Sequence, residues 1–390
     1  MFLLVATLFG QAVVRGYVAG GGKPFFYQEE FGPAVLAACG HDLLNPPDVT
    51  VDPAYAGISS FLAQQSGAFD CGSLPAAMTS RPPNAALAAS VWRVMGVSWR
   101  SLDWLNGLFM GISTAAAYLF LRAAMGTVLA TTLTVLWATS PLHLSQVPHL
   151  RDYAKTPFFA VMLCGVMWAA RSAGSRASTV LTMATLGLCF GFGFGIRTDV
   201  LSYLPLIVVA LLFRPEWSRA ELLTRGLAIM AAAVMFLAVA APILRAYREG
   251  NNMAHVAVLG LTDPSRNWLR LQPAPYSYGY LYDDGFVVAM ISGDVERHQA
   301  LTTPLRYGSY GYAFWGNDFF RRLLKTFPGD ALTRAWSAVR EAFRLPLTSL
   351  KMQRPSWSTG VVDQLFGWRA SIVEAFSLGA PTLMALAALV

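Results

Sequence analysis

Two cations and a carboxylate share one short segment of the chain, because Arg151, Asp152 and Lys155 lie together between two apolar runs. An Arg and a Lys four positions apart face the same side of a helix, so both can reach one phosphate, the Arg as a fork of donors and the Lys as a compact charge. Asp152 could orient either cation or accept a proton. A membrane-interface anchor also uses cations and tyrosines, but it has no need of the Asp.

A second group of interest is the acidic pair Glu29 and Glu30, which follows directly after the first apolar run. One of the two carboxylates could act as a general base or hold a metal ion. The simpler interpretation is a solvated start of a loop.

Arg197 and Asp199 are enclosed between two further apolar runs. Ionisable groups at or near membrane depth are costly, which makes them functional candidates by default. The alternative is that the two residues pair with each other.

The last candidates follow the seventh apolar run, where Arg245, Arg248 and His255 precede a tyrosine-rich stretch that ends in Tyr282 and Asp283. Alternating tyrosines suit stacking against sugars, and the cations could assist a phosphate site. Aromatic residues at a membrane interface explain the tyrosines equally well. Two adjacent acids, Asp283 and its neighbour, are a weak signal for a bound cation.

The composition indicates that lipid surrounds much of the chain that holds these residues. Of 390 residues only 13% are charged and 55% are apolar, and the mean hydropathy is +0.46. Disordered, collagen-like and disulfide-dense classes are excluded, and a soluble enzyme is disfavoured. The sequence has no Walker A loop, GxGxxG, HExxH or GxSxG motif and no nucleic-acid module, so ATP-driven transport has no support.

We predict an all-α membrane protein, a polytopic helical bundle of about eight spans. The first run is interpreted as a retained span and not a cleaved signal peptide. The expected spans are 1–20, 104–121, 127–145, 157–171, 178–196, 200–213, 226–244 and 371–390.

The positive-inside rule sets the expected orientation. Short even-numbered loops carry six cations against two acids, whereas the connection 21–103 carries four cations and seven acids. This places the N-terminus in the cytoplasm and the connections 21–103, 146–156, 196–199 and 245–370 outside. The excess of cations in 245–370, fifteen against ten acids, opposes that placement, but long loops escape the rule.

The predicted organisation is a transmembrane core 1–244 with its outer loop 21–103, an outer segment 245–370 and a final span 371–390. Helices are expected at 31–39, at 85–98 and in two stretches of 319–345 separated at Pro328. The second stretch reads as a basic amphipathic helix, either at an anionic interface or packed on its neighbours. Cys39 and Cys71 share the first outer loop and are either bridged or free.

This layout resembles the GT-C superfamily, integral-membrane glycosyltransferases that use polyprenyl-phosphate-linked sugars. The likeness covers most of the chain: a first span, an outer loop opening with Glu29 and Glu30, a charged short loop with Arg151 and Lys155, and a late outer segment. Two departures are Asn45-Pro46-Pro47 where many members have Lys-Pro-Pro, and an end within an apolar run where relatives have further spans.

By this resemblance, Glu29 or Glu30 would deprotonate the acceptor hydroxyl. The donor phosphate would be bound by Arg151 and Lys155 with help from Arg197, Arg245 and Arg248. Supporting roles are expected for Asp152, Asp199, His255, Tyr282 and Asp283. We expect no metal and no cofactor.

The predicted activity is sugar transfer from a polyprenyl (pyro)phosphate to an acceptor hydroxyl, with donor, membrane lipid and a glycan or lipid acceptor as partners and no nucleic acid. The alternatives are a transporter or flippase of a lipid or glycan, and an outer-face glycan ligase or polymerase. A transporter favours midplane charges and inverted repeats, neither of which is evident. The expected location is the bacterial inner membrane, active outside the cytoplasm.

Overall fold

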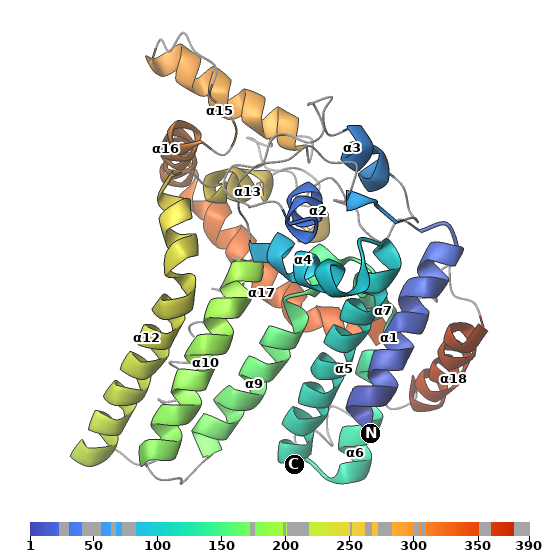
Figure 1. Ribbon diagram of the computed structural model, residues 1–390. Coiled ribbons are helices and arrows are strands. Elements are labelled where there is room, and N and C mark those ends of the chain that lie inside the picture. Colours follow the sequence, from blue (N-terminus) through green and yellow to red (C-terminus); the bar gives the residue numbers. More distant parts are fainter. Residues whose placement is uncertain are drawn as a thin grey trace. The chain divides into compact units, whose positions relative to one another are not determined.

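The computed structural model describes most of the chain as helices (Figure 1). It describes residues 1–22, 31–40, 56–63, 68–71, 83–171, 176–197, 200, 218–249, 252–261, 267–271, 283–299, 305, 307, 309–350 and 360–377. Within these ranges there is no strand, only an isolated antiparallel bridge between Ala68 and Ser98. The prediction of an all-α protein is confirmed for these residues.

Four of the described helices are long and apolar enough to cross a membrane. They are α1 (Phe2–Ala19), α5 (Trp99–Ala124), α10 (Arg176–Ile196) and the Arg219–Arg245 part of α12 (Arg219–Glu249). They correspond to the predicted runs 1–20, 104–121, 178–196 and 226–244. The chain is therefore an integral membrane protein by the length and composition of its helices.

None of the other four predicted spans is among these candidate membrane-spanning helices of the described residues. The run 127–145 is not one helix: α6 (Thr127–Ala138) ends at Thr139, and α7 (Pro141–Gln146) begins anew with the Ser140 side chain accepting from the His143 amide. Twelve residues rise only about 18 Å, too little for the hydrocarbon core. The run 157–171 forms α9 (Thr156–Arg171), which is not among the four. Residues 200–213 and 378–390 lie almost wholly outside the described residues.

The chain divides into two compact units, Met1–Ala240 with Lys351–Val390, and Ala241–Leu350. The predicted boundary at 244–245 falls inside α12, which contributes to both units. In the first unit α1, α5, α9 and α10 lie side by side, and α2 (Gly32–Ala38), α3 (Ala56–Ala63) and α4 (Pro83–Met95) gather beyond one end of them (Figure 1). We call this the capped end of the first unit. Helix α18 (Gly360–Ser377) contacts α1.

Helices α1 and α5 approach closely because glycines line their contact. Gly107 and Gly111 form a GxxxG pattern on α5. A Cβ at Gly107 would lie 2.6 Å from the Thr7 carbonyl oxygen, and one at Gly111 would lie 2.6 Å from that of Leu3. Small residues at this spacing let helix backbones meet in a membrane, where packing and not water exclusion drives association.

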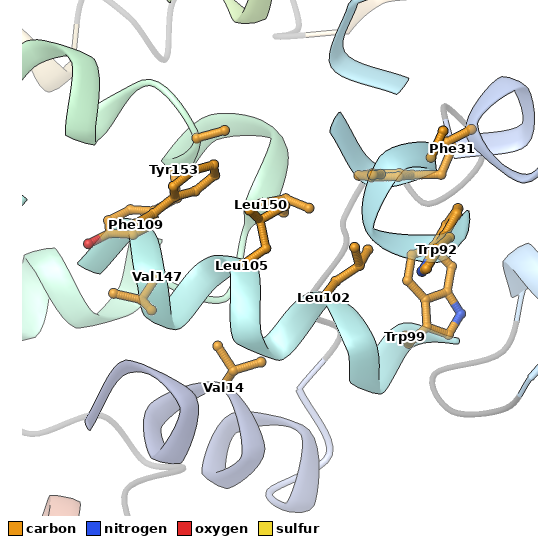
Figure 2. Packing of buried hydrophobic residues seen from close by; sticks show 14 of the residues in the cluster. Val14, Phe31, Trp92, Trp99, Leu102, Leu105, Phe109, Val147, Leu150 and Tyr153 are labelled. Carbon is orange, nitrogen blue, oxygen red and sulfur yellow. The ribbon is translucent and has the colours of Figure 1, made fainter. Parts of the chain in front are cut away.

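The capped end holds the largest apolar core of the described residues (Figure 2). Phe31, Trp92 and Trp99 pack together with ring centroids 5.5–6.2 Å apart. Leu102 and Leu105 continue this core down α5. Burial of such aromatic rings contributes about 25 cal/mol for each Å² of apolar surface removed from water.

A disulfide also fixes the connection between α1 and α5 covalently. Cys39, at the end of α2, forms a disulfide with Cys71, 32 residues later. The bridged alternative of the two sequence interpretations is therefore the one observed, and Cys164 and Cys189 are free. The predicted helices 31–39 and 85–98 are confirmed as α2 and α4.

The second unit contains α13 (Met253–Leu259), α15 (Asp284–Gln299), α16 (Tyr310–Thr326) and α17 (Pro328–Leu350). Val258, Val287, Ile291 and Tyr312 form its small core. Pro328 begins α17 after a break at Phe327, as the sequence predicts for 319–345. Arg322 of α16 forms ion pairs with Asp294 and Asp318.

We expect Gly111→Ala to destabilise the protein by about 1–3 kcal/mol, because the new methyl group meets the Leu3 backbone, which cannot move aside without shifting α1. Thermal unfolding in detergent measures the effect. The matched control is Gly16→Ala on α1, where a Cβ meets nothing within 4 Å. That variant should be neutral or more stable, since Ala favours helix over Gly. Equal melting temperatures for the two variants would contradict the tight contact.

Candidate functional site

An ion pair joins the two short loops that the sequence places on the outer face. Nη1 of Arg197 lies 2.9 Å from Oδ1 of Asp152, and both side chains are about one-third exposed or less. Arg197 follows the last residue of α10, and its amide continues the helix by donating to the Gly193 carbonyl. Two of the predicted site residues are thus in direct contact.

The packing of α8 (Leu150–Tyr153) explains why the charged side chains of this segment remain accessible. Leu150 and Tyr153 are buried and point into the core beside Phe109 of α5 (Figure 2). A helical period of 3.6 residues then leaves Arg151 and Asp152 away from that core. Both are half-buried in the structure.

Lys155 lies in the turn between α8 and α9 (Thr156–Arg171). It stands immediately before α9, where its carbonyl accepts from the Phe159 amide, and its side chain is half-buried. Arg151 and Lys155 therefore flank Asp152 in sequence while Arg197 contacts it in space. The group holds three cations and one carboxylate, so its net charge is positive. We call Arg151, Asp152, Lys155 and Arg197 the loop cluster.

Sequence reasoning missed a second ion pair at the capped end. Nε of Arg15, in the last turns of α1, lies 3.6 Å from Oδ2 of Asp103, in the second turn of α5. Two residues after Arg15, the ring of Tyr17 packs edge to face against the ring of His149, with the ring centroids 5.7 Å apart. The available signal was an Arg near the end of one apolar run and an Asp at the start of the next, since ionisable groups within spans pair with each other.

Several predicted residues lie outside the described residues: Glu29, Glu30, Asp199 and Tyr282. Phe31, the neighbour of Glu30, is buried against Trp92 and Trp99 at the start of α5. Among the described residues, no group of three or more His, Cys, Asp and Glu is arranged to hold a metal ion.

The remaining predicted residues belong to the second unit. Arg245 is exposed on α12, and Arg248 lies in the same helix. Asp283 accepts from the Phe286 amide at 2.8 Å and so caps the N-terminus of α15. This contact gives Asp283 a structural reason to be present.

His255 has a hydrogen-bond partner on each ring nitrogen. Nδ1 lies 2.7 Å from the Tyr312 hydroxyl and Nε2 lies 2.9 Å from Oδ1 of Asp284. Burial, with Tyr307 and Asp284 nearby, raises the pKa of Tyr312, so its hydroxyl keeps the proton and donates to Nδ1. Nε2–H then donates to Asp284. A buried, fully bonded histidine of this kind ties α13, α15 and α16 together.

Comparison with protein-family models, with curated proteins and with solved structures finds no match for this chain. The chemistry of the site therefore has to be argued from its own residues.

We expect Tyr312→Phe to lower the stability of the second unit by about 1–3 kcal/mol, because it removes the donor to the buried Nδ1 of His255. Limited proteolysis and thermal unfolding measure this loss. Asp284→Asn is the control, since the Asp284 side chain is 72% exposed and an amide can still accept from Nε2. A Tyr312→Phe protein as stable as the control would show that the network adds no stability.

Proposed function

We propose that this protein transfers a sugar from a polyprenyl phosphate or pyrophosphate to an acceptor hydroxyl at the outer membrane face. The observation that carries the proposal is the loop cluster, in which Arg197 contacts Asp152 between Arg151 and Lys155. It lies at an end of membrane-spanning helices, where the headgroup of a lipid-linked donor would be found.

The charge of the cluster fits the chemistry of such a donor. As the glycosidic bond to phosphate breaks, negative charge develops on the leaving oxygen, and fixed cations that face it lower the barrier. Arg binds two phosphate oxygens with its planar fork, and Lys adds a point charge. In this proposal Asp152 holds the Arg197 guanidinium in position until a phosphate arrives.

The acceptor hydroxyl must also lose its proton, which requires a base. Glu29 or Glu30 remains our proposed base, since a carboxylate suits this task and the segment follows the end of α1 at the capped end. Arg245 and Arg248 remain proposed donor contacts, with Asp199, Tyr282 and His255 as supporting residues.

The Cys39–Cys71 disulfide supports the proposed orientation. Disulfides persist in oxidising compartments, such as the bacterial periplasm, and not in the cytoplasm. The bridge lies in the connection 21–103, which the positive-inside rule independently assigns to the outside. Both arguments favour an inner-membrane protein whose charged loop cluster faces outward.

We expect purified full-length protein to release or transfer sugar from at least one donor in a panel of radiolabelled polyprenyl-phosphate sugars. Arg197→Ala and Arg151→Ala should each lose about 10²–10³-fold in rate, the usual cost of removing one charge-stabilising donor. One of Glu29→Gln and Glu30→Gln should abolish transfer. Arg122→Ala is the matched control, an exposed cation at the far end of α5 that bonds only the Met125 carbonyl among the described contacts.

A charge exchange separates phosphate binding from a structural ion pair. The double variant Asp152→Arg, Arg197→Asp keeps an ion pair between the two positions but moves the cation from position 197 to position 152. If Arg197 serves only structure, the double variant regains the activity that Arg197→Ala loses, which would contradict our assignment. Unchanged turnover in every variant would place the site elsewhere, and lipid binding without turnover would favour the transporter.

The orientation has its own test in intact cells of a Gram-negative host with a permeabilised outer membrane. In a Cys164→Ser, Cys189→Ser background, an impermeant reductant followed by an impermeant maleimide should label Cys39 and Cys71. The unreduced protein is the control and should stay unlabelled. Labelling that requires lysis of the inner membrane would reverse the proposed topology.

A further inference from the structure

Helix α17 exposes three large apolar residues and buries Arg334. Leu332, Trp336 and Val339 are 72%, 69% and 48% exposed, whereas Arg334 and Ser337 are 8% and 2% exposed. The three exposed residues recur at four- and three-residue spacing, so they form one stripe along the helix. We call Leu332, Trp336 and Val339 the apolar stripe.

The charged face of α17 is occupied by contacts with the protein itself. Arg334 pairs with Asp330 one turn earlier, at 2.7 Å. Arg340 donates to the Leu269 carbonyl at 3.4 Å, and Arg270 lies 3.6 Å from Glu341. The Arg334–Asp330 pair lies within α17, whereas the contacts with Leu269 and Arg270 tie the helix to another segment, so the apolar stripe cannot turn inward without breaking those two contacts.

This arrangement is the reverse of a helix on a water-soluble protein, which buries its apolar stripe and exposes its charges. A large exposed row of apolar side chains marks a surface that meets protein or membrane. The helix also holds five charged residues, and it is not among the helices apolar enough to span a membrane. A helix lying in the plane of the interface satisfies both conditions.

We propose that α17 lies at the outer boundary between lipid headgroups and acyl chains, with the apolar stripe in the acyl region. The second unit, which contains α17, starts inside α12. The Arg219–Arg245 part of α12 is the most apolar of the four candidate spans. The chain therefore enters this unit from a membrane surface. Trp336 at the centre of the stripe suits that depth, where tryptophan is enriched.

The charges beside the stripe match an anionic headgroup layer. Of the six cations in the stretch 319–344, Arg322, Arg334 and Arg340 are engaged in contacts within the protein. Arg321 and Lys325, on the turns of α16 before α17, are both exposed. Each Lys or Arg near an anionic surface adds about 1 kcal/mol of attraction. The occupant of the stripe is thus an anionic lipid surface, and α17 would be a second membrane attachment of this unit besides α12.

Spin labels on the full-length protein test this placement. Cysteine is introduced at Trp336 or Val339 in a Cys164→Ser, Cys189→Ser background, and the protein is reconstituted in vesicles of phosphatidylcholine and phosphatidylglycerol in equal parts. We expect collisions with oxygen, which concentrates in lipid, to exceed collisions with a water-soluble nickel chelate several-fold at both positions. The matched control is Thr333→Cys, also exposed on α17 but a quarter turn from the stripe, where the ratio should fall.

Two results would overturn the proposal. Stripe labels as accessible to the nickel chelate as Thr333→Cys would place α17 in water. Labels shielded from both reagents, with dipolar broadening between molecules, would show a second copy of the chain on the stripe. Because the substituted side chains are exposed, unchanged thermal unfolding confirms that each variant is folded. The outcome does not depend on sugar transfer, so the two proposals fail separately.

Discussion

The burial of the first half of α5 is the constraint on which the first unit depends. Between Trp99 and Ala116 this helix is covered on most sides, and even Asn106 is wholly buried, with its amide donating to the Pro148 carbonyl. A helix in this position needs small residues on one face to admit α1 and aromatic residues at its start to hold the segment that contains α2 and α4. Gly111 meets the first need and Trp99 the second. Loss of either contact would release elements that are far apart in sequence.

The positions of the charged side chains in the loop cluster follow from that packing. Tyr153 anchors α8 in the core beside α5, and the helical period then sets where Asp152 can be. Arg197 follows the last residue of α10 and forms an ion pair with Asp152 of α8. The ion pair therefore lies beside apolar contacts of Tyr153 and Ile196. In the sugar-transfer proposal, these contacts keep the Arg197 cation fixed before a donor phosphate arrives. Such preorganisation is what makes electrostatic stabilisation effective.

Sequence reasoning succeeded where a long apolar run or a proline marked an element, and it failed on one helix cap and on contacts between loops. Apolar length alone predicted α1, α5, α10 and α12, and Pro328 marked the start of α17 correctly. The single span over 127–145 was wrong although its signal was present, since Ser140 and Pro141 are a cap and a first-turn proline that start a new helix. The pairing of Arg197 with Asp152 was not predictable, because charge spacing along a chain does not say which loops meet.

Whether an amphipathic helix turns its apolar face inward or outward depends on whether water or lipid surrounds it. The periodicity of the sequence does not reveal which of the two it is. On α4 Trp92 is buried and Arg93 next to it is exposed, as on a surface in water, whereas Val94 and Met95 at the end of the helix are exposed too. In α1 the sense reverses: Leu4 is 65% exposed and Gln11 is 4% exposed, as expected beside acyl chains. The apolar stripe of α17 follows α1 and not α4, although its sequence pattern alone fits either. In our proposal, α17 therefore meets the same solvent as α1.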